Sequence, residues 1–382
     1  MKKISNLLMM ALLAIGMGLT SCDEQLDNAV TPGTDEQGEV TSITVDLSKI
    51  DEKYLDTEKT KLQLTVGDEV TLSFTILPEE MASTEVELTA ADATILSIDG
   101  LKVKALKEGE TKVTAKAGDK TAECTVTVKA ANPLATPLTV EAITAGTITV
   151  NSPKAGMQYS LNGGAKTAVS GDISVSAGDK VAFYGNGTSI TSYNGTKIVG
   201  GTADIKVYGN IMSLVDETGF ATNTTLTADN AFTKLFNGNA KLTDASGLLL
   251  PALTLAFSCY SYMFQNCSSL TTAPAELPAL TLSMACYDSM FYGCEALTTA
   301  PALPATTLVL ICYQYMFYNC SALTSAYVKA AYIATMGECM GMFGGCTAAG
   351  VLHTTTANKD SWDSAISSEG WSTWTAAGDW ND

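Results

Sequence analysis

The sequence predicts a mainly β protein in which two small β domains precede a short repeat region and a C-terminal cap. Residues 42–130 alternate apolar and polar side chains with period two, in short runs separated by Gly-Asp, Glu-Gly and Asp-Gly pairs, and this spacing favours a β-sandwich. A nine-residue phrase returns about every 27 residues between positions 207 and 350. All four tryptophans fall in residues 351–382, where a stack of repeats needs a cap over its exposed core.

The first 21 residues are predicted to be a signal peptide. A basic "MKK" precedes the apolar run "ISNLLMMALLAIGMGL", which is shorter than the roughly 20 residues that a transmembrane helix needs. The run ends in "LTSC", and this ending resembles a bacterial lipobox. The resemblance implies that the Cys22 thiol is diacylated and becomes the mature N-terminus. An ordinary secretory signal with a chance cysteine is the alternative.

Residues 22–41 are expected to form a flexible tether. They contain Pro, Gly and acidic residues without periodicity. The acidic residues directly after Cys22 resemble the surface-export signal of lipoproteins from gut Gram-negative bacteria. The predicted location is therefore the outer membrane, exposed at the cell surface, with the N-terminal lipid as the only contact with the membrane.

The composition argues against nucleic-acid binding and against an enzyme. The formal net charge is -18, and every basic residue is lysine, whereas arginine is the usual reader of phosphate and guanine. A single histidine, His353, is too few for a histidine-based metal site or a catalytic triad. The sequence also lacks a nucleophile elbow and a recognisable metal motif. We therefore expect no enzymatic activity, no metal and no cofactor.

Residues 42–130 closely resemble a group-2 bacterial immunoglobulin-like domain. The resemblance rests on "LTVGDEVTLSFTILP" at 64–78 and on the strand-rich run at 95–128. Such domains commonly act as spacers on surface proteins. Cys124 has no cysteine partner within this region, so we interpret it as a buried small hydrophobe. The acidic loops favour solvated acids over a calcium site, because no EF-hand spacing is present.

Residues 131–206 are predicted to form a second small β domain. A linker, "AANPLATP", precedes several runs of strand-like alternation. Asn162-Gly163 is a strong hairpin signal between two of these runs. The glycine-rich "GNGTS" at 185–189 lacks the lysine and the following helix of a phosphate-binding loop.

Residues 207–350 closely resemble BspA-type leucine-rich repeats. The phrase reads "CYSYMFQNC" at 259–267, "CYDSMFYGC" at 286–294 and "CYQYMFYNC" at 312–320. A variant of "LTxAPxLPAxTL" follows the first two copies, and "SALTSAYV" follows the third. A looser copy is "CMGMFGGC" at 339–346. The period is that of leucine-rich repeats, although Ala and Pro stand at several positions where leucine is commoner. The resemblance implies a short solenoid.

Stacking of the copies would turn each repeated position into a ladder. Four phenylalanines are then expected to form one buried column: Phe264, Phe291, Phe317 and Phe343. The cysteines form two further ladders, beginning at Cys259 and Cys267. Disulfides are possible in an exported chain, but we favour free buried thiols. A degenerate first copy has Asn239 where Cys267 would stand, so the position does not require a bonded sulfur.

Four repeated tyrosines are the candidate ligand-binding residues. Tyr262, Tyr292, Tyr315 and Tyr318 flank the buried Met-Phe pairs and are expected to be partly exposed. A tyrosine ring offers contact area at low entropic cost, and its hydroxyl offers a hydrogen bond. The alternative is that these rings only cover the core. The four tryptophans likewise favour a cap, with a sugar-stacking platform as the alternative.

These observations predict a lipid-anchored binding protein at the cell surface. The BspA-type family includes surface adhesins that bind host matrix and plasma proteins, and this resemblance implies an extracellular protein ligand for the repeats. A surface lipoprotein that binds glycans through tyrosine or tryptophan platforms is the alternative. A purely structural role in a surface layer also remains open at the level of sequence.

Overall fold

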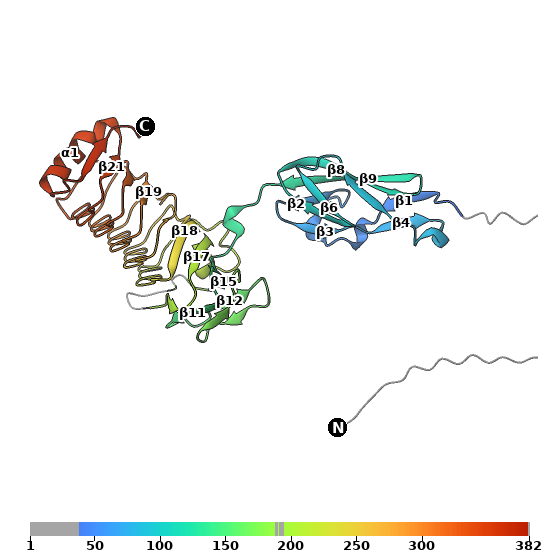
Figure 1. Ribbon diagram of the computed structural model, residues 1–382, viewed down its shortest axis with the longest axis horizontal. Coiled ribbons are helices and arrows are strands. Elements are labelled where there is room, and N and C mark those ends of the chain that lie inside the picture. Colours follow the sequence, from blue (N-terminus) through green and yellow to red (C-terminus); the bar gives the residue numbers. More distant parts are fainter. Residues whose placement is uncertain (1–37, 188–189, 191–194, 381–382) are drawn as a thin grey trace, which may run out of the picture. The chain divides into compact units, whose positions relative to one another are not determined.

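The computed structural model describes residues 38–187, 190 and 195–380, which form two compact units (Figure 1). The boundary between the units falls between Ala131 and Asn132. The fold is mainly β, with one α-helix among the described residues, so the mainly β part of the predicted class is confirmed. The leader, Cys22 and most of the predicted tether lie outside the described residues.

In the described part of the first unit, residues 38–131, nine strands form three sheets. The strands are β1 (Ser42–Val45), β2 (Leu62–Thr65), β3 (Glu69–Thr71), β4 (Phe74–Leu77), β5 (Glu87–Ala90), β6 (Leu96–Asp99), β7 (Lys102–Ala105), β8 (Gly109–Ala117) and β9 (Lys120–Lys129). The sheet orders are β2-β9-β8-β5, β3-β7-β6 and β1-β4. Alternate side chains such as Leu62, Leu64 and Val126 are wholly buried, as the period-two pattern requires. Cys124 is buried with them.

The second unit begins as antiparallel β-structure and continues into the repeats. Its strands are β10 (Thr139–Ala142), β11 (Gly146–Asn151), β12 (Gln158–Leu161), β13 (Thr167–Ala168), β14 (Ile173–Val175), β15 (Lys180–Tyr184), β16 (Lys197–Gly201), β17 (Ile205–Asn210), β18 (Leu242–Leu249), β19 (Thr299–Leu303), β20 (Ser325–Val328), β21 (Gly350–His353) and β22 (Trp374–Ala377). The helix α1 spans Lys359–Ser368. Short 3-10 helices span Leu47–Lys49, Glu52–Tyr54 and Glu79–Met81 in the first unit, and Pro133–Ala135, Ile211–Leu214 and Thr356–Asn358 in the second.

The predicted boundary near residue 206 is not a break in the structure. Strand β17 lies in a six-stranded sheet of order β13-β12-β15-β10-β17-β18, and it pairs in parallel with β18 of the first repeat copy. Ile205 is the register partner of Leu242. One continuous hydrophobic core runs from Leu138 to Ala376. The region predicted as a separate small β domain therefore shares one unit with the repeats, because its last strand supplies the edge that the first copy extends.

Two alternating sets of backbone hydrogen bonds join and shape the repeat copies, which lie side by side between β18 and α1 (Figure 1). In one set, an amide donates to the next copy, as Tyr260 N–H does to the Cys286 carbonyl at 2.9 Å and Phe264 N–H does to Met290 at 2.8 Å. In the other set, the intervening amides close tight turns, as Met263 N–H does to Tyr260. The backbone N–H groups of each phrase thus find their hydrogen-bond acceptors partly within the same copy and partly in the next copy.

Every fourth residue, starting directly before the phrase, has a left-handed backbone conformation with positive φ. In the copy that begins at Ser258, the φ angles of Ser258, Tyr262 and Asn266 are 51°, 58° and 60°. The last of these positions alternates between glycine and asparagine along the stack: Gly238, Asn266, Gly293, Asn319 and Gly345. Glycine and asparagine tolerate this conformation best, which explains why the residue before each ladder cysteine is one of the two.

Aromatic side chains form two buried columns through the copies. Neighbouring rings of the phenylalanine column Phe236, Phe264, Phe291, Phe317 and Phe343 lie 5.2–5.7 Å apart between centroids. The expected column is therefore present, and Phe236 of the degenerate first copy extends it. Tyr260, Tyr287 and Tyr313 stack in a second buried column, with centroid separations of 5.6 and 6.1 Å.

The cysteines are free and buried in the part of the chain that the structure describes. Four of them donate a thiol hydrogen bond of 3.1 Å to the carbonyl of a phenylalanine in the preceding copy: Cys267 to Phe236, Cys294 to Phe264, Cys320 to Phe291 and Cys346 to Phe317. Asn239 fills the same role, since its Nδ2 donates to the Ile198 carbonyl at 2.9 Å. The position of Cys267 and its equivalents therefore holds a small side chain that donates a hydrogen bond to a backbone carbonyl. This is a more specific role than that of a small hydrophobe.

Three of the four tryptophans close the end of the phenylalanine column. The rings of Trp362, Trp371 and Trp374 lie 6.3, 5.3 and 4.6 Å from that of Phe343, and all three side chains are buried. Trp362 extends from α1, and its Nε1 donates to the Ala330 carbonyl at 2.9 Å. This arrangement matches the cap and leaves only Trp380 half-buried at the surface.

Candidate functional site

Three of the four predicted tyrosines come together on the repeats. Tyr292 and Tyr318 hold equivalent positions in successive copies, and their rings stack at 5.1 Å with an interplanar angle of 10°. The ring of Tyr315 meets Tyr318 edge-on at 5.6 Å. All three side chains are half-buried. We call Tyr292, Tyr315 and Tyr318 the tyrosine cluster.

Glycines of the last copy provide room for two rings of the tyrosine cluster. Gly341 and Gly344 occupy the positions equivalent to Tyr315 and Tyr318. A Cβ atom on Gly341 would lie 2.4 Å from Tyr315 Cε1, and one on Gly344 would lie 2.5 Å from Tyr318 Cε2. The rings therefore rest on the backbone of the last copy. A ligand can contact the exposed parts of rings that are already held in place, so it loses little side-chain entropy.

The row of positions equivalent to Tyr262 and Tyr315 is not tyrosine throughout. Ser289 holds the equivalent position in the copy between Tyr262 and Tyr315, so the row of tyrosines is interrupted. The Lys234 ammonium lies 5.5 Å from the Tyr262 ring centroid, a cation–π distance. Burial raises the pKa of Asp288, although hydrogen bonds from Ser289 and Tyr262 partly offset that rise. Tyr262 therefore belongs to a charged neighbourhood rather than to an uncharged aromatic strip.

A second group of aromatic side chains lies on the exposed face of the sheet β19-β20-β21-β22. The Tyr327 ring stacks on the His353 ring at 4.4 Å, and Trp380 meets Tyr327 edge-on at 6.0 Å. His353 Nδ1 lies 2.9 and 3.0 Å from the two carboxylate oxygens of Asp379. We call Tyr327, His353, Asp379 and Trp380 the strand-face cluster.

The strand-face cluster was not predicted from the sequence, although a signal was present. Ala326 and Val328 are buried on either side of Tyr327, and Leu352 is buried beside His353. Period-two alternation therefore places Tyr327 and His353 on the same outer face once the two strands are aligned. Their register as direct partners comes only from the structure.

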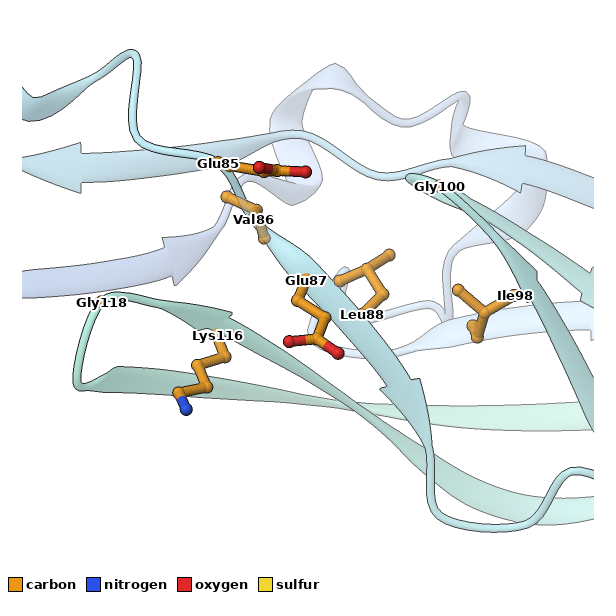
Figure 2. A pocket seen from close by; sticks show the side chains of 8 residues that line it. All are labelled: Glu85, Val86, Glu87, Leu88, Ile98, Gly100, Lys116 and Gly118. Carbon is orange, nitrogen blue, oxygen red and sulfur yellow. The ribbon is translucent and has the colours of Figure 1, made fainter.

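The first unit contains an open pocket of about 670 Å³ beside the edge strand β5 (Figure 2). Figure 2 shows Glu87 and Lys116 on neighbouring strands and Ile98 across the pocket from them. The pocket is lined by Glu85, Val86, Glu87, Leu88, Ile98, Gly100, Lys116 and Gly118. Its charged lining residues are Glu85, Glu87 and Lys116, and no aromatic side chain lines it.

Neither a metal-ligand cluster nor a membrane-spanning helix is found in the described ranges. No group of three or more histidine, cysteine or acidic side chains is placed to hold a metal ion there. Within the same residues, no helix is both long enough and apolar enough to span a bilayer.

Comparison with family models and with curated proteins finds no match for this chain.

Proposed function

We propose that this protein is a lipid-anchored binding protein of the bacterial outer membrane, exposed at the cell surface. In this proposal Cys22 carries the lipid, and the first unit is an immunoglobulin-like sandwich that acts as a spacer. The stacked copies form a BspA-type leucine-rich-repeat solenoid that acts as the binding head. The ligand is an extracellular protein, as for the adhesins that the repeats resemble.

The observation that carries this proposal is the tyrosine cluster on a nearly uncharged stack. Few charged side chains occur between positions 250 and 350: Glu276, Asp288, Glu295, Lys329 and Glu338. Aromatic residues are enriched at protein interfaces, whereas charged residues are depleted from the centres of those interfaces. Preordered, half-exposed tyrosines with few charges nearby fit that description.

Glycan recognition is the second candidate function, and it requires an aromatic side chain that a sugar can reach. Trp362, Trp371 and Trp374 are buried against Phe343 and cannot serve as a sugar platform. Trp380 is the remaining tryptophan, and it lies in the strand-face cluster.

The two units allow a direct test of where binding occurs. Residues 38–131, residues 132–382 and the chain from residue 23 with its leader removed would each be applied to an array of matrix and plasma proteins. We expect residues 132–382 to bind the same proteins as the longer chain, with the same affinity, and residues 38–131 to bind none. Full affinity in residues 38–131 would show that the repeats are scaffold.

A further inference from the structure

We propose that the exposed face of the sheet β19-β20-β21-β22 is a separate binding site for a neutral saccharide, whose ring stacks on Tyr327. This site lies on different residues from the tyrosine cluster and goes beyond the proposed recognition of a protein. Tyr327 is 36% exposed and lies on an inner strand of this sheet.

One face of the Tyr327 ring is covered and the other is open. On the β21 side, His353 stacks against the ring at 4.4 Å and with an interplanar angle of 12°. On the β19 side, the register partner of Tyr327 is Ala302. A methyl group is too small to cover an aromatic ring. The ring face turned toward β19 is therefore available to a ligand placed over Ala302.

His353, Tyr327 and Ala302 are register partners on neighbouring strands, and together they form the Tyr327 row. The next position along this row, Glu276, supplies a hydrogen-bond acceptor. Glu276 forms a β-bridge with Ala302 and is exposed. Neighbouring strands lie about 4.8 Å apart, so Glu276 and Tyr327 are separated by roughly 10 Å across Ala302. That spacing accommodates one pyranose ring, with its C–H face against Tyr327 and its hydroxyl groups toward the Glu276 carboxylate. The hydroxyls of Thr299 and Ser325 stand on the adjacent row of the same sheet.

The surrounding contacts fix the Tyr327 ring before a ligand arrives. His353 is held by Asp379, whose two carboxylate oxygens both lie within hydrogen-bond distance of Nδ1. The Trp380 ring packs at a near-right angle to the Tyr327 ring, with 6.0 Å between the centroids. Because the ring is already oriented, little conformational entropy is lost on binding. His353 and Asp379 act as positioning residues in this arrangement.

The charges around the site favour a neutral sugar. Glu276 and Asp379 are both acidic, and the chain carries a net charge of -18, so an anionic ligand is repelled. Carboxylates accept hydrogen bonds from sugar hydroxyls but offer nothing to a purely apolar ligand. An aromatic face beside carboxylate and hydroxyl groups therefore fits a neutral saccharide better than a phosphate, a sulfated glycan or a lipid chain.

The test uses the chain from residue 23 and a panel of neutral polysaccharides: xylan, mixed-linkage β-glucan, galactomannan, arabinan and starch. Affinity gel electrophoresis identifies the polysaccharide that is bound, and calorimetry with its oligosaccharide gives the Kd. We expect Tyr327→Ala to weaken binding by about tenfold or more, since the stacked face is lost. Ala302→Leu keeps Tyr327 but covers its open face, and it should weaken binding to a similar extent.

Two controls test whether the loss of binding belongs to this site. Met336→Ala changes an exposed side chain of the same unit, outside the strands of this sheet, and should leave the Kd unchanged. A double change of Tyr292 and Tyr318 to Ser should also leave saccharide binding intact, so loss of the proposed protein ligand does not affect this test. The inference is overturned if no polysaccharide of the panel binds, or if Tyr327→Ala and Ala302→Leu both bind like the parent.

Discussion

Replacing Phe291 by alanine is expected to lower the free energy of unfolding by about 3–5 kcal/mol. The Phe291 side chain is fully buried, and its ring stacks between Phe264 at 5.2 Å and Phe317 at 5.7 Å. The cavity left by the change is lined by rings of the two neighbouring copies. Because each copy is stabilised mainly by its neighbours, the loss should spread along the stack. Urea denaturation followed by circular dichroism measures the effect.

Phe257 provides the matched control for Phe291→Ala. It belongs to the same stack, but its side chain is 37% exposed. Phe257→Ala should therefore cost less than about 1 kcal/mol, as changes outside the core usually do. Equal losses for the two variants would show that Phe291 does not belong to the core of the repeats.

Replacing Gly209 by alanine is expected to cost about 3 kcal/mol or more. Gly209 lies in β17 with φ +83°, and an added Cβ would stand 2.2 Å from the Pro137 carbonyl oxygen and 3.0 Å from that of Thr136. The left-handed conformation costs a non-glycine residue about 1–2 kcal/mol, and overpacking adds about 1–3 kcal/mol. Both close atoms belong to the backbone, so they cannot rotate away.

Gly178 separates the two contributions to the cost of Gly209→Ala. Its φ of +87° is nearly the same, but no atom lies within 4 Å of an added Cβ. Gly178→Ala should therefore lose only the conformational part, about 1–2 kcal/mol. If thermal unfolding shows equal losses for the two variants, β17 does not pack tightly against the backbone of Thr136 and Pro137.

Repetition made the core of the second unit predictable from the sequence. Equivalent positions such as Phe264 and Phe291 reveal a buried column because a stack places them one above the other. The same logic indicated that Cys267 and Asn239 share one role. It could not show that the role is to donate a hydrogen bond to the preceding copy, because the acceptor is a backbone carbonyl about 30 residues away.

Features that do not repeat were harder to predict. The join between β17 and β18 depends on a parallel pairing of strands separated by a long connection, and no sequence pattern marks it. The strand-face cluster combines Tyr327, His353 and Trp380. The positions beside Tyr327 in the preceding copies hold Ala302 and Glu276, so no repetition in the sequence points to this cluster. The interruption of the tyrosine row at Ser289 was visible in the sequence.

The most direct test of the proposed function measures binding by a variant in which Tyr292 and Tyr318 are both changed to Ser. The probe is the matrix or plasma protein that the parent chain binds most tightly on the array, and Leu280→Ser, at a side chain 64% exposed on the same stack, is the control. The proposal predicts that the double variant keeps the parent's melting curve but loses more than about 1 kcal/mol of binding free energy. It also predicts that the control binds like the parent. A double variant that binds with the parent's Kd would contradict the assignment of the tyrosine cluster as the ligand-binding surface.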